Sequence, residues 1–296
     1  MWEQLKHNLG GSDFKSLARS ISLVENEVEG YESFLQSLPQ SRANIIGITG
    51  PPGAGKSTLT DALIGTYIAE EKKVAVLCVD PSSAFNLGAL LGDRIRMSHW
   101  YNHPGVFIRS LASRGSMGGL HPKIIEVTDT VKAAGFDVVI IETVGVGQSE
   151  IEIAGLADTT VVVLVPEAGD EVQTMKSGLM EIADVFVVNK ADRPGAATFV
   201  KNLKQMLAPA FHTHEQEIPI VKTIALQKEG VQELKEKISQ LHSNQNAEKK
   251  LWLLAEKAYQ LIRNKRMTDI NKRTLKEMIA KETDGFNLYQ FVEKNS

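Results

Sequence analysis

The clearest chemical signal in the chain is a glycine-rich stretch, GPPGAGKST, which occupies positions 50–58 directly after an apolar run. The stretch completes the pattern G-x-x-x-x-G-K-[ST] with Gly50, Gly55, Lys56 and Ser57. Glycines allow the backbone to approach phosphate oxygens, the following helix start attracts anions, and the lysine adds positive charge. We therefore predict that a nucleotide phosphate is bound by Gly50, Pro51, Pro52, Gly53, Ala54, Gly55, Lys56, Ser57 and Thr58. Within this set Lys56 is a predicted catalytic cation, and Ser57 is the predicted Mg²⁺ ligand.

A second motif, Asn-Lys-Ala-Asp at 189–192, follows the apolar run 185–188 and matches the N-K-x-D element by which G proteins recognise guanine. A carboxylate accepts paired hydrogen bonds from the guanine N1–H and exocyclic amine, whereas adenine has no such pair of donors. Asp192 is therefore predicted to select the base. Asn189 is predicted to brace the surrounding loops, and the Lys190 stem to cover the base. Because the motif lies downstream of a phosphate loop, it favours GTP over ATP.

Three acidic residues stand where a metal could be bound: Asp80, Asp93 and Glu142. Asp80 and Glu142 each follow an apolar run, and parallel α/β sheets bind ligands at the carboxyl ends of their strands. Asp93 lies in the segment 80–120, whose poor periodicity beside a nucleotide loop is typical of a functional switch. Mg²⁺ prefers oxygen ligands but keeps several waters, so each acid either binds the metal directly or holds a water.

The segment ETVGVGQ at 142–148 resembles the D-x-x-G switch, with glutamate in place of aspartate. Gly145 is predicted to approach the γ-phosphate through its backbone N–H and to move when that phosphate leaves. Gln148 either positions the attacking water or is an exposed polar loop residue.

The elements that position these motifs are strands expected near 45–48, 74–79, 136–141, 159–165, 185–188 and 218–223, with helices between them. Continuously apolar strands that alternate with helices predict an α/β fold with a mostly parallel sheet covered on both faces. We expect an N-terminal helical extension over 1–43, a P-loop GTPase domain over 44–242 and a C-terminal helical segment over 243–296. The last segment either forms a dimer arm or packs against the sheet domain.

Composition excludes several function classes. The 33 basic and 36 acidic residues give a net charge of −3, so no overall field favours nucleic acid or anionic lipid. Cys78 is the single cysteine and is interpreted as a buried strand residue, so no internal disulfide can form. The sequence has neither an apolar signal segment nor an apolar run long enough to span a membrane. We expect a cytoplasmic protein that binds neither nucleic acid nor membrane.

Several motifs in order, GPPGAGKST, VDPSS, LGDRIRM, RGSMGGL, ETVGVGQSE, GDEVQTMKSG, EIAD and NKAD, resemble the MeaB/ArgK family of G-protein chaperones. This family serves adenosylcobalamin-dependent methylmalonyl-CoA mutase, and the resemblance covers about residues 40–230. It implies a SIMIBI-class P-loop GTPase, usually homodimeric, that uses GTP/GDP and Mg²⁺. It also implies a role in gating cofactor delivery to the mutase and guarding that enzyme against inactivation.

The resemblance assigns roles to individual switch residues. Asp80 and Asp93 fall in switch I, Glu142 in switch II, and Lys176 in a third switch that responds to the mutase. All four are expected to take part in catalysis.

The resemblance also places the final base-binding loop at Ile224, Ala225 and Leu226. Two departures from the family pattern stand out: Glu167 replaces an expected glycine, and Ile224 replaces a usual serine.

Two other function classes remain open. One is a small-molecule or transport-linked kinase or ATPase, and the other is a nucleotide-dependent interaction protein whose turnover is unimportant.

Overall fold

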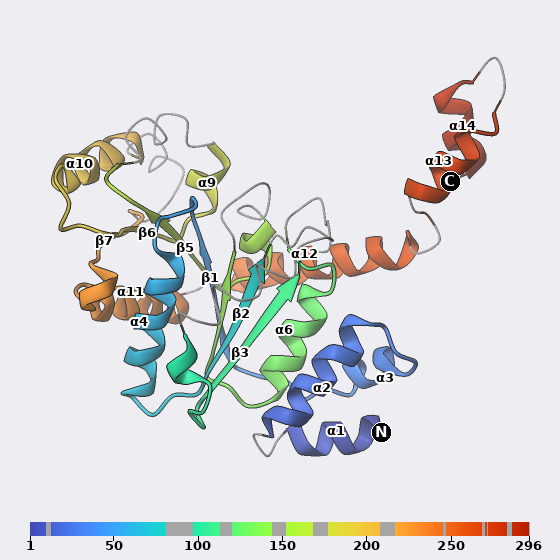
Figure 1. Cartoon of the computed structure of the whole chain (residues 1–296). Helices are drawn as coiled ribbons and strands as arrows, with labels where there is room; N and C mark the ends of the chain where they lie inside the picture. The colour runs from blue at the N-terminus through green and yellow to red at the C-terminus, as the bar shows by residue number, and fades with distance from the viewer. Residues whose placement is uncertain are drawn as a thin grey trace. The chain divides into compact units, whose positions relative to one another are not determined.

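Figure 1 shows the computed structural model of the chain. The structure describes residues 1–9, 13–80, 97–112, 120–143, 152–167, 177–207, 217–244, 247–267, 270, 272–282 and 286–295. The chain divides into two compact units, Met1–Lys250 and Leu251–Ser296.

The first unit is built on a seven-stranded sheet in the order β3-β2-β4-β1-β5-β6-β7. The strands are β1 Asn44–Thr49, β2 Val74–Asp80, β3 Val106–Ala112, β4 Val138–Glu142, β5 Thr159–Leu164, β6 Val185–Val188 and β7 Ile220–Lys222. Every neighbouring pair is parallel. The predicted parallel α/β sheet is thus confirmed, with β1 at its centre. β3 runs past the apolar stretch 106–108 because it pairs with β2 up to Ala112.

The described helices are α1 Trp2–Leu9, α2 Phe14–Glu25, α3 Tyr31–Gln36, α4 Lys56–Ile68, α6 Ile124–Ala133, α9 Ser177–Ile182, α10 Ala196–Leu207, α11 Val231–Ser243, α12 Ala247–Arg266, α13 Lys272–Ile279 and α14 Leu288–Asn295. Short 3-10 turns are η2 Ser98–Trp100, η3 Ile153–Gly155 and η5 Ala225–Gln227. The sequence predicts a helix over 171–182, of which only α9 is described, since 171–176 lie outside the described residues. The sequence also predicts a short helix over 150–155, whose described part contains the turn η3. α14 lies within the C-terminal helical segment expected over 243–296, although no separate helix is predicted at 288–295.

Helices cover both faces of the sheet. On one face α4 and α11 pack over alternate strand residues, including Ile48, Ile140 and Val163. On the other, α10 packs over the intervening residues of β5 and β6, such as Val162 and Phe186. This alternation follows from the strand geometry, in which successive side chains point to opposite faces.

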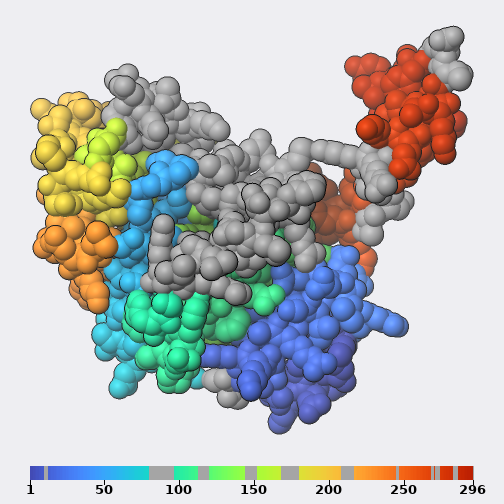
Figure 2. Space-filling model, in the orientation of Figure 1, coloured from blue at the N-terminus to red at the C-terminus, as the bar shows by residue number. Residues whose placement is uncertain are grey.

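The N-terminal helices form an outer layer that packs through α2 on α6. The apolar residues Leu17, Ile21, Val24 and Val28 recur at helical spacing in the sequence, and the first three are buried on α2. The helix ends at Glu25, so Val28 lies beyond it. Arg109 of β3 donates from Nη2 to Glu25 Oε2 at 2.6 Å and ties this layer to the sheet. In Figure 2 the blue N-terminal helices accordingly lie against the green segment of the chain.

The second unit carries an unusual share of exposed apolar side chains. They are Leu251, Trp252, Leu254, Tyr259, Ile262, Met267, Met278, Ile279, Phe286, Leu288, Tyr289 and Val292. Within it, the Phe286 and Phe291 rings pack at a centroid distance of 5.7 Å. None of the described helices combines the length and apolar character needed to cross a membrane.

Candidate functional site

The glycine-rich loop joins the end of β1 to the start of α4. Gly50 has φ 137° and Gly55 has φ 87°, a backbone region that L side chains rarely adopt. A Cβ at Gly50 would lie 2.1 Å from the Val163 carbonyl oxygen, and one at Gly55 would lie 2.4 Å from Asn189 Nδ2. Both positions therefore require glycine, for their backbone conformation and for the close approach of neighbouring segments.

The ammonium group of Lys56 lies inside this loop. Its Nζ donates to the carbonyl oxygens of Gly50 at 2.8 Å and Pro51 at 3.0 Å. The side chain is only 6% exposed, so the cation is held close to the loop backbone. A phosphate bound by the loop N–H groups would meet this charge directly.

Glu142, the last residue of β4, lies against the first turns of α4. Its Oε1 accepts from the Ser57 hydroxyl at 2.6 Å, and its Oε2 accepts from the Thr60 hydroxyl at 3.0 Å. The contact is possible because β4 is the direct neighbour of β1, with Ile48 opposite Glu142. The carboxylate is 5% exposed. The sheet thus brings a buried carboxylate to the serine of the phosphate loop.

Asn189 connects the end of β6 to two other loops. Its Nδ2 donates to the Ala54 carbonyl oxygen at 2.9 Å. Its Oδ1 accepts from the Thr223 hydroxyl at 3.0 Å and from the Ala225 backbone N–H at 3.1 Å. One buried amide therefore links the phosphate loop, the Asn-Lys-Ala-Asp loop and the turn η5.

Lys190 and Asp192 take different positions in the same loop. Lys190 adopts a left-handed backbone with φ 56°, and its Nζ donates to the Gly53 carbonyl oxygen at 2.8 Å. Its stem consequently reaches across to the phosphate loop. Asp192 is exposed. In the described part of the structure no hydrogen bond or ion pair engages its carboxylate, which leaves both oxygens able to accept from a ligand.

A family model described as methylmalonyl Co-A mutase-associated GTPase MeaB matches residues 17–282. The chain belongs to the MeaB family. It is therefore a GTPase, a class of enzyme that binds guanine nucleotide.

Individual relatives support this membership. A Pyrococcus abyssi protein named as a GTPase is 47% identical over 245 residues, which are 81% of this chain and 76% of that protein. GTPase ArgK of Escherichia coli is 39% identical over 230 residues, or 74% of this chain and 69% of ArgK. A fused isobutyryl-CoA mutase of Geobacillus kaustophilus is 39% identical over 234 residues, or 74% of this chain but 22% of that longer protein.

The fold is also that of a solved relative. The crystal structure of a protein named LAO/AO transport system kinase aligns with a TM-score of 0.64 and 26% identity. The alignment covers 99% of this chain and 95% of that one. The fold class predicted from the sequence is thus confirmed.

The structure brings part of the predicted MeaB-family site together. The phosphate-loop residues meet Glu142 on one side and Asn189 and Lys190 on the other. Ala225 is buried beside Asn189, whereas Leu226 of the same turn is 87% exposed.

The structure gives no side-chain contacts for the other predicted residues of the MeaB-family site. Asp93, Gly145, Gln148 and Lys176 lie outside the described residues. Asp80 ends β2, the neighbour of β4, and only its backbone is described.

Sequence reasoning missed two hydroxyl residues that this site uses. Thr60 donates to Glu142, and Thr223 donates to Asn189. A signal for Thr60 was present, since it lies three residues after Ser57 and so on the same side of the helix. Thr223 carried no comparable signal, because its partner is 34 residues away in the chain.

The departure at Glu167 has a structural consequence. This residue follows β5, and its carboxylate forms an ion pair with Arg193, the residue after Asp192. The Arg193 guanidinium holds the pKa of the Glu167 carboxyl below its ordinary value. The end of β5 is therefore tied to the loop predicted to bind the base.

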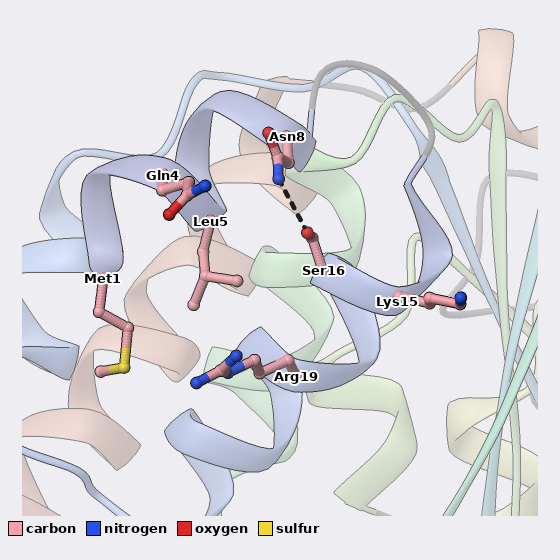
Figure 3. Close-up of a pocket in the computed structure, with 7 residues that line it drawn as sticks. All are labelled: Met1, Gln4, Leu5, Asn8, Lys15, Ser16 and Arg19. Atoms are coloured by element: carbon pink, nitrogen blue, oxygen red, sulfur yellow. Dashed lines mark hydrogen bonds between the residues drawn. The ribbon is translucent and has the colours of Figure 1, made fainter.

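A separate groove of about 430 Å³ lies between α1 and α2 (Figure 3), and none of its lining residues belongs to the nucleotide loops. It is lined by Met1, Gln4, Leu5, Asn8, Lys15, Ser16 and Arg19. Ser16 Oγ accepts from Asn8 Nδ2 at 3.1 Å and donates to Asp13 Oδ2 at 2.6 Å. Asn8 and Ser16 are therefore hydrogen-bonded within the N-terminal helices.

Proposed function

We propose that this chain is a Mg²⁺-dependent GTPase that regulates an adenosylcobalamin-dependent mutase of the methylmalonyl-CoA type as its chaperone. In this role it assists cofactor loading and protects the loaded enzyme. The observation that carries the proposal is the link from Asn189 to the Ala54 carbonyl oxygen, because it joins the base motif to the phosphate loop. In a MeaB-family chain this link supports one site for a whole guanine nucleotide.

Specificity for guanine is assigned to Asp192. Its exposed carboxylate offers two acceptor oxygens, which suit the N1–H and exocyclic amine of guanine. The Lys190 stem covers the base, and Ile224, Ala225 and Leu226 contact it. The exposure of Leu226 supports a contact with a bound group rather than with the protein core.

Magnesium fits the donors around the phosphate loop. The Ser57 hydroxyl and the Glu142 carboxylate are hard oxygen donors held at 2.6 Å from each other, and Asp80 ends the strand beside β4. Ser57, Asp80, Asp93 and Glu142 would hold the ion directly or through water. When bound, Mg²⁺ would neutralise charge that develops on the transferred phosphoryl group.

The protein's own groups supply the remaining catalysis. The loop N–H groups and the Lys56 ammonium stabilise negative charge on the phosphates. Gly145 senses the γ-phosphate through its backbone N–H, and Lys176 adds a cation when the partner docks. Catalysis of this kind consists of positioning and charge compensation rather than covalent chemistry with the protein.

The partner is proposed from family and relatives. The family is described as mutase-associated, and the Geobacillus kaustophilus relative, of which this chain matches 22%, is named a fused isobutyryl-CoA mutase. We assign the chain a mutase partner of this class, a homodimeric state and a cytoplasmic location. The exposed apolar residues of the second unit support an interaction with another chain. Nucleic acid and membrane are not assigned as partners.

The deciding experiment measures GTP and ATP hydrolysis with Mg²⁺ or EDTA, in the presence and absence of a purified adenosylcobalamin-dependent acyl-CoA mutase. The proposal expects selective, Mg²⁺-dependent GTP turnover that the mutase accelerates. Phosphate transfer to a small molecule or transport protein would instead indicate the kinase class. Nucleotide-dependent mutase binding and full protection of the mutase that persist when a non-hydrolysable GTP analogue replaces GTP would indicate an interaction protein.

A further inference from the structure

Two hydroxyl groups on one helix hold the same carboxylate. Ser57 and Thr60 are three residues apart on α4, a spacing that places their side chains on one side of the helix. Ser57 donates to Glu142 Oε1 at 2.6 Å, while Thr60 donates to Glu142 Oε2 at 3.0 Å. Each carboxylate oxygen thus has its own donor from α4.

The two bonds together restrict the orientation of the carboxylate more than either bond alone. The terminal torsion of a glutamate is broad, so a single hydrogen bond leaves the carboxylate plane free to turn. A second bond to the other oxygen defines the plane. The Thr60 side chain has 0% exposure, so water cannot readily replace its hydroxyl as a donor. Its hydrogen bond to Oε2 therefore helps to set how that carboxylate faces Ser57.

We propose that Thr60 is a positioning residue. It orients the Glu142 carboxylate toward the Ser57 hydroxyl, where the proposed Mg²⁺ would be bound. The proposal rests on the Mg²⁺ dependence stated above. Thr60 itself does not touch nucleotide or metal. It acts through Glu142, as outer partners of metal-binding carboxylates do when they define the orientation of the ligand.

The test compares Thr60→Val, which keeps the side-chain shape but removes the hydroxyl, with Thr60→Ser, which restores it. Thr128→Val is the matched control, because Thr128 is equally buried and donates to the Ile124 carbonyl oxygen on α6. For each protein, Mg²⁺ is titrated while binding of a fluorescent GDP and hydrolysis of GTP are followed. GDP affinity is also measured in EDTA, and the midpoint of thermal unfolding is recorded.

Thr60→Val should raise the Mg²⁺ concentration for half-maximal effect by about 10–100-fold, the usual cost of losing such an outer partner. GDP affinity in EDTA should remain that of the wild type, and Thr60→Ser should restore the Mg²⁺ response. Thr128→Val should lower thermal stability without changing that response. If Thr60→Val does not fold, Thr60→Ala is compared with Thr60→Ser in the same way.

Two results would overturn different statements. If wild-type turnover needs Mg²⁺ but Thr60→Val and wild type respond alike to it, the role of Thr60 is wrong and the proposed function stands. If wild-type binding and turnover are the same in EDTA, the Mg²⁺ dependence of the proposed function is wrong, and the role of Thr60 fails with it.

Discussion

Asn189, at the end of β6, donates from Nδ2 to the Ala54 carbonyl oxygen in the phosphate loop at 2.9 Å. The two residues are 135 positions apart in the chain. The amide is buried, and its oxygen also accepts from Thr223 and Ala225. The geometry of the phosphate loop is thus coupled to that of the two loops around it.

Asn189→Ala should lower the free energy of unfolding by about 1–3 kcal/mol, because it leaves buried partners without a hydrogen bond. Nucleotide affinity should fall as well, since the loops lose their common brace. Chemical denaturation and calorimetry with GDP measure the two effects. Asn26→Ala is the control, because Asn26 forms an exposed bond at the end of α2. Equal, small effects of both substitutions would contradict the bracing role.

Asp192→Asn should shift preference from guanine toward xanthine nucleotides, because an amide donor suits the xanthine carbonyl that replaces the guanine amine. Loss of the charged contact should weaken guanine binding by about 2–5 kcal/mol. Competition between GTP and xanthosine triphosphate checks this. An unchanged preference for GTP would contradict the assignment of Asp192.

Lys56→Ala should weaken both triphosphate binding and hydrolysis, because it removes the cation held in the phosphate loop. Ser57→Ala should impair Mg²⁺-dependent hydrolysis more than nucleotide binding. Calorimetry and phosphate release separate the two effects. Lys72→Ala, which removes a half-exposed lysine paired with Asp137 at 3.8 Å, serves as the control. Wild-type turnover in both site variants would contradict their roles.

Lys176→Ala should abolish the acceleration of GTP hydrolysis by the partner mutase. A cation supplied on docking can contribute about 10³–10⁵ in rate. The quantity to measure is the ratio of turnover with mutase to turnover without it. Lys201→Ala, at an exposed position of α10, should keep the wild-type ratio. A wild-type ratio in Lys176→Ala would instead show that Lys176 is not needed for the acceleration of GTP hydrolysis by the mutase.

Glu167→Gln should have a small effect that depends on pH. The Arg193 ion pair lowers the folded-state pKa of Glu167 below its ordinary value of 4.5, so its stabilisation is present above that value. It is lost as the pH falls through the folded pKa. Because both side chains are nearly half exposed, the difference at neutral pH should stay below about 1 kcal/mol. Denaturation of both proteins at pH 7 and at pH 3 should show the difference shrinking in acid, and a difference that grows in acid would contradict this account.

The sequence by itself determined the motifs that are continuous in the chain. The phosphate loop is recognisable because its glycines, lysine and serine lie within eight consecutive positions. The parallel sheet is recognisable because buried strands are apolar along their whole length. Membership of the MeaB family, expected from such motifs, is confirmed by the family match.

Only the tertiary structure decided which distant residues meet. Glu142 reaches Ser57, 85 positions away, because the order of the sheet places β4 beside β1, and no spacing in the sequence encodes that order. Thr60 then acquires a partner that its own helix could not predict. Glu167 likewise meets Arg193 only because β5 and β6 are neighbours. A short continuous motif such as the phosphate loop can be recognised from the sequence. These contacts depend instead on strand pairing, which is set by packing over the entire core.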